Sequence, residues 1–386
     1  MMGDPKLIVL CFDALEKKII ETGGYNNLKL VTHGKTDISE FQLAKSVILW
    51  SSLLTGKNME TFLKDFLYEF DVGPLRIRIP TELGDRLEKR IWGGWGGKIF
   101  GKFAPLRKYL NERIWRIRLN SEDTFLKCFK TYIAIDMVAL SHKMRRHKKE
   151  RILMSDYFNY DVDEGVFDNI MKFFSRLYYF DDKRDVRNIK KQKRLDIEKE
   201  FIEWAWDGHS KNKAELFNAL EKDYDLILFF TPLADLVGHL SFGLENKMRE
   251  VYKDLDTLVA NIIEKTRDKN NVIIGISDHG MEQIVLKLSQ GVFKKTRYGD
   301  HGDLKHGTYF INRTIEEIKE HYEKRKIMFN DFEQYDIQRS LGRLEEGNPT
   351  LRDFHHIIKI YRSIPANKIT YVQTRARRWR SWVKPF

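Results

Sequence analysis

Short, uninterrupted apolar runs recur along the chain, at residues 6–12, 224–230 and 272–276. Each is rich in β-branched, aliphatic or aromatic side chains and is bounded by polar residues, which is typical of a strand buried on both faces of a parallel sheet. Residues 47–54 indicate a buried helix, and residues 245–265 carry apolar side chains at amphipathic helical spacing. The pattern predicts an α/β fold with a doubly wound, mostly parallel sheet flanked by helices.

Acidic residues and histidines follow each of the three runs. Asp13 follows the first, Asp235-Leu-Val-Gly-His239 the second, and Ser277-Asp278-His279-Gly280 the third. Open α/β sheets bind ligands beyond the carboxyl ends of their strands, so these side chains are expected at one edge of the sheet. Carboxylate oxygens together with imidazole nitrogens suit zinc or manganese. The pattern therefore favours a site for two divalent metal ions.

Each motif taken alone has a simpler interpretation. An Asp and a His four positions apart are commonly a surface or capping pair, and they converge only if the backbone between them is helical. Asp13 is a candidate N-cap for a helix over residues 14–20. Ser46 is a candidate N-cap for the helix over 47–54, or it faces an anion at the free backbone N–H groups there. Gly56 is the expected end of that helix.

Together these motifs resemble the alkaline phosphatase superfamily and, within it, the type I phosphodiesterase and nucleotide pyrophosphatase family, especially its archaeal-like members. The resemblance covers roughly residues 5–60 and 215–312. In that family the nucleophilic hydroxyl lies ten positions before the glycine of a Thr-Gly pair, which implies Ser46. The family pattern also implies an alkaline phosphatase-like fold and two bound metal ions, with zinc expected and manganese as the alternative.

The resemblance assigns the metal ligands as two groups. It implies that Asp13, Asp278, His279 and the Ser46 oxygen hold one ion, and that Asp235, His239 and a late histidine hold the other.

The late histidine has two candidates. A Gly-x-His a few residues before an aromatic strand favours His301, whereas His306-Gly307, directly before the apolar run 309–311, also resembles the family pattern. The histidine that is not a ligand is expected to support the ligands from outside the metal site or to be structural. The chain departs from the family at Ile48 and Leu49, where members often carry a Pro and a Ser or Thr.

The implied activity is hydrolysis of a phosphodiester or nucleotide pyrophosphate bond through a covalent phosphoseryl or nucleotidyl intermediate on Ser46. Neither the Cys/Ser-x-Pro-x-Arg motif of sulfatases nor the Asp-Ser-Ala of alkaline phosphatases occurs at this position, which favours a diesterase over a monoesterase. Two alternatives remain open: a phosphomonoesterase or phosphotransferase of the same superfamily, and a nucleic-acid or membrane-surface binding protein with a degenerate site.

Composition changes between the motifs and suggests a division into domains. Residues 1–70 and 206–374 are expected to form the catalytic core, and residues 71–205, with a glycine-rich aromatic segment and a basic run, an inserted cap that recognises substrate. In the tail, residues 375–386, arginines alternate with tryptophans, so it could bind a nucleic acid or an anionic surface.

Whole-chain composition limits the remaining choices. The 386 residues are 42% hydrophobic, enough for a large core, and the formal charge of +12 favours an anionic phosphate-ester or nucleotide substrate. Cys11 and Cys128 are the only cysteines, so no disulfide framework is expected. With no signal peptide and no apolar run long enough to span a bilayer in the sequence, a cytoplasmic location is expected. Composition leaves the oligomeric state open.

Overall fold

The structure of the protein is a computed structural model. It describes residues 5–42, 45–63, 68–72, 75–79, 110–112, 119–140, 150–153, 187–267, 270–287, 293–301 and 306–365.

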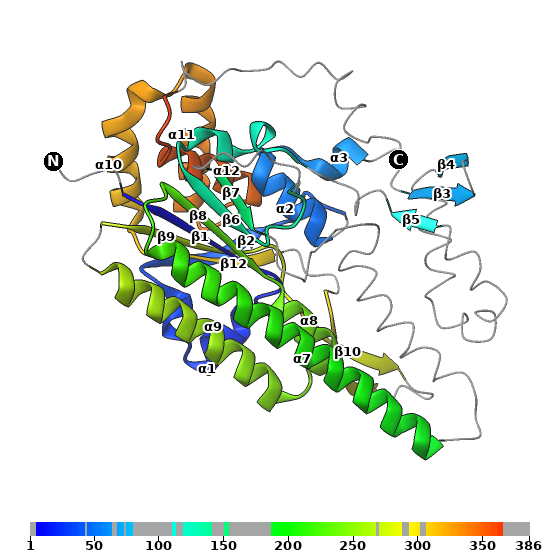
Figure 1. Ribbon diagram of the computed structural model, residues 1–386. Coiled ribbons are helices and arrows are strands. Elements are labelled where there is room, and N and C mark those ends of the chain that lie inside the picture. Colours follow the sequence, from blue (N-terminus) through cyan, green and yellow to red (C-terminus); the bar gives the residue numbers. More distant parts are fainter. Residues whose placement is uncertain are drawn as a thin grey trace.

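A seven-stranded sheet forms the centre of the molecule, in the order β2-β12-β9-β1-β8-β6-β7 (Figure 1). Its strands are β1 (Leu7–Phe12), β2 (Thr32–Asp37), β6 (Tyr132–Ile135), β7 (Glu150–Leu153), β8 (Leu226–Thr231), β9 (Val272–Ser277) and β12 (His306–Ile311). Strand β12 is antiparallel to both of its neighbours, and the other pairings are parallel. The predicted α/β fold with a mostly parallel sheet is confirmed.

The register of β1 brings the predicted motifs to the same level of the sheet. Its last residue, Phe12, is opposite Thr231 of β8 on one side and Ser277 of β9 on the other. All three strands therefore end together, and the segments that follow them begin at one edge. This is the edge at which open α/β sheets place their ligands.

Helices cover both faces of the sheet (Figure 1). One face carries α1, α7, α8 and α9, and the other carries α2, α10, α11 and α12. Their bounds are α1 (Lys17–Gly23), α2 (Ser46–Thr55), α7 (Arg187–Leu220), α8 (Leu233–Ser241), α9 (Glu245–Thr266), α10 (Ile315–Arg325), α11 (Asp331–Glu345) and α12 (Leu351–Ile360). The helices predicted over 47–54 and 245–265 correspond to α2 and α9, so both predictions are confirmed.

Shorter elements complete the described part of the chain. They are the helix α3 (Met59–Leu63), the 3-10 turns η1 (Asn26–Lys29), η3 (Ser121–Asp123), η4 (Phe125–Cys128) and η6 (Lys326–Met328), the hairpin β10 (Glu282–Lys287) with β11 (Phe293–Asp300), and a three-stranded sheet of β3 (Tyr68–Val72), β4 (Leu75–Ile79) and β5 (Leu110–Glu112).

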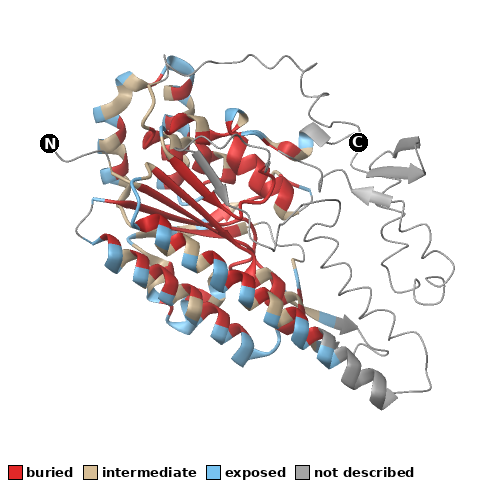
Figure 2. Ribbon diagram, in the orientation of Figure 1, coloured by how far each residue is buried: buried red, intermediate tan, exposed pale blue. Residues whose placement is uncertain are grey.

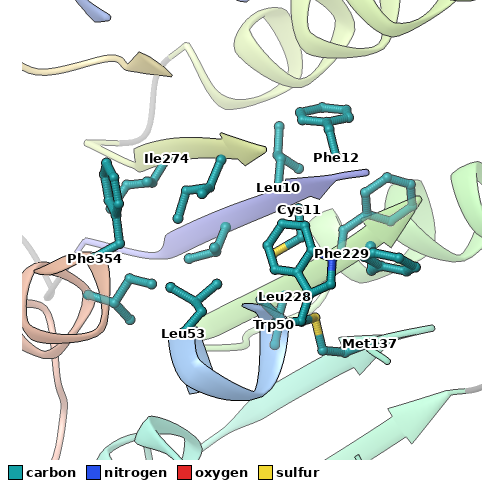
Figure 3. Close-up of a cluster of buried hydrophobic side chains, with 14 of the residues drawn as sticks. Leu10, Cys11, Phe12, Trp50, Leu53, Met137, Leu228, Phe229, Ile274 and Phe354 are labelled. Carbon is teal, nitrogen blue, oxygen red and sulfur yellow. The ribbon is translucent and has the colours of Figure 1, made fainter. Parts of the chain in front are cut away.

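The core lies between the central sheet and its helices. Every residue of β1, β8 and β9 is buried, as Figure 2 shows by the continuous red of these strands. In Figure 3, Trp50 and Leu53 of α2 lie against β1 and β8, with Phe354 of α12 beside them. The Trp50 ring packs edge-on against Phe230 at a centroid distance of 5.6 Å. Helix α2 is therefore fixed by apolar packing that extends almost to its first residue.

Two strands of the central sheet fall inside the predicted cap, residues 71–205. Strands β6 and β7 extend the sheet beyond β8, and the boundary predicted at residue 205 lies within the continuous helix α7. These parts of the range belong to the core because they continue its hydrogen-bonded sheet and its helical layer. For the rest of the chain the division into core, cap and tail stays a prediction. The segments 90–102, 142–149 and 366–386 lie outside the described residues.

Across the ranges given above, no helix has both the length and the apolar character needed to cross a bilayer.

Candidate metal centre and nucleophile

Asp13 lies in a strained turn directly after β1. Its backbone N–H donates to the carbonyl of Thr231 at 3.0 Å, and the next residue, Ala14, has a φ of 63°. Only glycine adopts such a φ readily, so packing around the turn must compensate for the strain. Asp13 is not the N-cap of the following helix, because α1 begins at Lys17 and is capped by Glu16. The interpretation of Asp13 as a helix N-cap is therefore wrong. Asp13 is only 5% exposed, and its carboxylate does not cap α1.

Asp278 and His279 occupy an irregular turn after β9, as their adjacency requires. The Ser277 hydroxyl closes this turn by donating to the carbonyl of His279 at 2.8 Å and accepting the N–H of Leu15 at 2.8 Å. His279 Nδ1 lies 2.9 Å from the carbonyl of Gly280, which makes Nδ1 the protonated nitrogen and leaves Nε2 free to act as a ligand. Nε2 lies 3.1 Å from Asp13 Oδ1.

Ser46 is the first residue of α2 and lies beside this pair. Its Oγ is 3.0 Å from Asp13 Oδ1 and 3.2 Å from His279 Nε2. The N-cap position is taken by Lys45, so Ser46 does not cap the helix. The structure thus brings together Asp13, Ser46, Asp278 and His279, the four residues that the family resemblance implies for one ion.

The second group of ligands comes from α8 and the residue that follows β11. Asp235 and His239 are one helical turn apart, with His239 Nε2 3.3 Å from Asp235 Oδ1. His239 Nδ1 lies 3.1 Å from the carbonyl of Gly299, which again leaves Nε2 directed toward the carboxylate. His301 Nε2 lies 2.9 Å from the same Asp235 oxygen.

His301 connects the two groups. Its ring centroid is 5.0 Å from that of His239 and 3.9 Å from that of His279. Ligand atoms of Asp235, His279 and His301 lie within 4.8 Å of one another, as do those of Asp13, Asp278 and His279. The two groups are therefore adjacent and share an edge of the same buried cluster.

His306, the other late candidate, belongs to neither group. It begins β12 and lies opposite Asp37 of β2. Burial, together with the nearby charge of Lys35, holds the pKa of His306 below its ordinary value. Of the two late histidines, the structure places His301 beside Asp235 and keeps His306 on the neighbouring strand.

The cluster holds more negative charge than a buried site tolerates without a cation. Burial raises the pKa of Asp278 well above its usual range, and the charge of Asp13 raises it further. Asp278 Oδ2 is buried and accepts no hydrogen bond from any described residue. Buried polar atoms normally have hydrogen-bond partners, so a carboxylate oxygen that accepts no hydrogen bond and lies 3.5 Å from His279 Nε2 fits a metal ion.

The histidines of the cluster are affected by the same excess of buried negative charge. Burial lowers the pKa of His279, but the charges of Asp278, Asp13 and Asp235 outweigh it and raise the pKa to about 10. In the same way Asp235 and Asp300 outweigh the burial of His239 and raise its pKa to about 9. Protons here compensate for charge that a divalent ion neutralises more fully. Three carboxylates and three imidazoles form a donor set that fits zinc or manganese.

A family model described as "Type I phosphodiesterase / nucleotide pyrophosphatase" matches residues 101–329, more than half of the chain. This chain belongs to that family. The resemblance inferred from the motifs is thereby confirmed. The matched residues include Asp235, His239, the Asp278-His279 pair and both late histidines, whereas Asp13 and Ser46 precede them.

Solved structures of similar proteins are only distantly related. Murine ectonucleotide pyrophosphatase / phosphodiesterase 5, solved as an inactive variant with AMP, is 16% identical with a TM-score of 0.34, over 72% of this chain and 58% of that one. Phosphonoacetate hydrolase from Sinorhizobium meliloti, solved with phosphonoformate, is 13% identical with a TM-score of 0.36, over 74% of this chain and 59% of that one. This chain thus spans less than two thirds of either protein. Comparison with curated proteins gave no match.

Several groups that hold the ligands in place were not predicted from the sequence. The carbonyl of Gly299 orients His239, and the carbonyl of Thr231 fixes Asp13. Neither has a sequence signal, because every residue carries a carbonyl. Asp256 of α9 accepts the N–H groups of Asn27 and Leu28 in η1 and so has a structural role.

Proposed function

We propose that this protein is a two-metal phosphohydrolase that cleaves phosphodiester or nucleotide pyrophosphate bonds, with Ser46 as the nucleophile. The observation that carries the proposal is the position of Ser46 Oγ, 3.0 Å from Asp13 and 3.2 Å from His279. A serine at the start of a buried helix has no structural need for two ionisable neighbours, whereas a nucleophile requires them. Membership of the type I phosphodiesterase / nucleotide pyrophosphatase family supports the same class of reaction.

Six side chains would hold the two ions. Asp13, Asp278 and His279 would hold one beside Ser46, and Asp235, His239 and His301 would hold the other. Bound there, divalent ions would lower the pKa of the Ser46 hydroxyl and neutralise the charge of a phosphoryl group. We expect zinc, with manganese as the alternative, because the donors are oxygen and nitrogen in equal number.

The residues of the chain account for the order of events at phosphorus. Asp13 Oδ1 accepts the hydrogen bond of the Ser46 hydroxyl and so holds its proton away from the attacking lone pair. As Ser46 Oγ forms a bond to phosphorus its proton passes to Asp13 Oδ1, the bond from phosphorus to the ester or anhydride oxygen breaks, that oxygen leaves with the bonding electron pair, and a phosphoryl or nucleotidyl group remains on Ser46. Water then hydrolyses this intermediate from the side of Asp235, His239 and His301, which divides one difficult displacement into two.

The N-terminus of α2 contributes a second source of anion stabilisation. Ser46 is the first residue of this ten-residue helix, so a phosphoryl group on its oxygen would lie at the positive end of the helix dipole. Packing of Trp50 and Leu53 against the sheet keeps that end in place. We therefore expect charge on the intermediate to be stabilised partly by backbone N–H groups.

A side-by-side assay tests this proposal. Protein treated with a chelator and reconstituted with zinc or manganese is compared on a phosphodiester and a phosphomonoester chromogenic substrate, together with Ser46→Ala. Ser51→Ala is the matched control, because Ser51 lies on the same helix and its hydroxyl bonds only to the carbonyl of Val47 among the described contacts. We expect metal-dependent diester cleavage that Ser46→Ala abolishes and Ser51→Ala retains.

The other outcomes lead to the alternatives. Faster hydrolysis of the monoester would indicate a phosphomonoesterase or phosphotransferase of the same superfamily. Full activity in Ser46→Ala would refute the nucleophile. Salt-sensitive binding of nucleic acid or anionic vesicles, with no turnover in any metal, would indicate a binding protein; the basic tail that motivates this alternative lies outside the described residues. A cytoplasmic location stays a prediction.

A further inference from the structure

A chain of buried polar side chains links helices α7 and α9 to strand β8, away from the ligands themselves. His209 of α7 is completely buried, with Nδ1 2.8 Å from Thr231 Oγ1 and Nε2 2.8 Å from Asp254 Oδ2. Lys213 Nζ lies 2.6 Å from the other oxygen of Asp254. A buried histidine with both nitrogens engaged is fixed in orientation and in tautomer.

The direction of these hydrogen bonds follows from charge. Burial lowers the pKa of His209, so its ring is neutral and carries one N–H. The pKa of Asp254 is held below its usual range by hydrogen bonds from His209 and Lys213, despite its partial burial. The carboxylate accepts the N–H of Nε2, and Nδ1 accepts the hydroxyl proton of Thr231. The Thr231 oxygen is thereby left with its lone pairs facing away from His209.

Thr231 contacts both the turn that carries Asp13 and the first turn of α8, the helix that carries Asp235 and His239. Its carbonyl accepts the N–H of Asp13, and its hydroxyl oxygen lies 3.4 Å from the N–H of Leu233, the first residue of α8. Pro232, at the N-cap position of α8, has no side-chain oxygen with which to cap it. Thr231 therefore takes over the capping of the helix that carries Asp235, while holding the turn that carries Asp13.

We propose that His209 is a positioning residue, and that the Asp254–His209–Thr231 chain sets the spacing between Asp13 and the Asp235–His239 pair and so the affinity for the two metal ions. This inference rests on the proposed function, since it concerns the same ions. Groups that orient metal ligands from outside typically contribute about 10- to 100-fold in metal affinity. The contacts place this orienting role on two helices that carry no ligand.

Substitutions that remove one hydrogen bond at a time test the chain. In Thr231→Val the hydroxyl is lost with little change of shape, whereas Thr231→Ser retains it. His209→Gln keeps a group near Asp254 but leaves Thr231 without its acceptor. Thr266→Val is the matched control, because Thr266 is also buried but its hydroxyl bonds within α9, to the carbonyl of Ile262.

The first measurement is zinc affinity, by competition with a chromogenic chelator on protein shown by circular dichroism to be folded. We expect Thr231→Val and His209→Gln each to weaken binding by about 10- to 100-fold, and Thr231→Ser and Thr266→Val to bind like the unsubstituted protein. The double variant should bind zinc no more weakly than the single variant with the lower affinity, because both substitutions interrupt the same Asp254–His209–Thr231 chain. Unchanged affinity, or losses that add, would overturn the proposal.

The second measurement needs no metal. Amide hydrogen exchange of the chelator-treated protein should be faster at Asp13 and Leu233 in Thr231→Val and His209→Gln than in Thr231→Ser. If the unsubstituted protein binds no divalent ion but these amides respond as expected, the two-metal function fails and the positioning of the turn stands. If zinc binds and the amides do not respond, the positioning role fails while the function stands.

Discussion

Individual residues of the metal cluster carry charges that conflict with their burial, and a bound cation would neutralise them. Asp278 is buried beside Asp13 with one oxygen unpaired, and His279 is driven to hold a proton by the surrounding acids. Without an ion, protons take the place of the missing positive charge. The protonation state of the site is therefore linked to metal binding.

Proton release is the first expected consequence. At pH 7.5 both His279, with a pKa of about 10, and His239, with a pKa of about 9, hold protons in the metal-free protein, and a metal requires both neutral. Zinc binding should therefore release these two protons together with the one that burial keeps on Asp278, and affinity should rise with pH up to about 10. Calorimetry in buffers of different ionisation enthalpy measures this number. His239→Gln should lower it by about one and His306→Gln should leave it unchanged; release near zero would contradict the assigned ligands.

Gly307 illustrates how closely the backbone approaches the site. A Cβ at this position would lie 2.1 Å from the carbonyl of Ser277, so Gly307→Ala must displace the turn that holds Asp278. We expect a loss of about 2 to 4 kcal/mol in the free energy of unfolding. Gly342→Ala, in helix α11 with open space around it, is the control and should stabilise by about 0.5 to 1 kcal/mol. Urea denaturation measures the free energy of unfolding of both variants. Equal effects of the two substitutions would refute the close contact at Gly307.

The meeting of Asp13, Asp235 and the Asp278-His279 pair at one edge was predictable, because each follows an apolar run and parallel strands end together. Ser46 and the late histidine were expected only from the family resemblance. The choice between His301 and His306 was not predictable. Both lie near the same edge, and only the path of β11 brings His301 to Asp235, which spacing along the chain does not encode.

At the scale of elements, α2 is held at both ends by different means. Its first residue faces the ligands, and at its other end His355 of α12 lies 3.0 Å from the carbonyl of Leu53 and 3.1 Å from that of Leu54. These carbonyls are among those that a helix leaves unpaired, so His355 completes the end of α2. Burial holds the pKa of His355 well below its usual value, with His356 and Lys359 lowering it further.

Stability should therefore fall in mild acid. His355 and His356, the latter with a pKa lowered to about 4 mainly by burial, bind protons less well folded than unfolded. The unfolded state gains protons as pH drops below about 6.5, so the free energy of unfolding decreases between pH 6.5 and 4, by up to about 1.4 kcal/mol per pH unit for each histidine. Urea denaturation at pH 7.0 and 5.0 measures the loss. His356→Gln should reduce it, and a variant that loses as much as the unsubstituted protein would contradict this origin.

Element prediction succeeded where the sequence pattern is long and continuous. Strands β1, β8 and β9 and helices α2 and α9 were recognisable because burial on all sides produces unbroken apolar runs or a clear helical period. Strands β6 and β7 are only four residues each, and β7 at the sheet edge includes Glu150 and Arg151, so neither stands out. Helix α7 continues through residue 205, so no break in secondary structure marks the predicted end of the cap.

At the scale of the whole molecule, the buried acidic side chains that would bind the metal ions lower the stability of the metal-free protein. A buried carboxylate with one oxygen that accepts no hydrogen bond, such as that of Asp278, costs free energy that the rest of the fold must supply. The ion returns this free energy only on binding, as RT ln(1 + [L]/Kd), or about 2.7 kcal/mol at one hundred times Kd. The free energy of unfolding of the entire chain should therefore depend on whether an ion is bound in this one cluster.

Asp278→Asn should separate the two effects. Because the folded protein favours the neutral form of this side chain, the amide should raise the free energy of unfolding in chelator by about 1 to 3 kcal/mol. The same variant should lose most of the stabilisation that zinc gives the unsubstituted protein. Thermal denaturation with chelator and with zinc measures both. Asp207→Asn, which removes an exposed acid from α7, should change neither, and a destabilised Asp278→Asn in chelator would contradict the charge conflict.

The central position of β1 has a consequence for how the protein is made. This strand is synthesised before the other strands of the sheet, and its partners are Leu226 to Thr231 on one side and Val272 to Ser277 on the other. Both of its edges therefore stay unpaired until these later residues have left the ribosome. Until then an entirely apolar segment has unpaired backbone on both sides, which is a template for aggregation. A nascent chain that stops before His301 has neither a closed sheet nor a complete set of ligands. The proposed set of six ligands is therefore complete only after His301 has been synthesised.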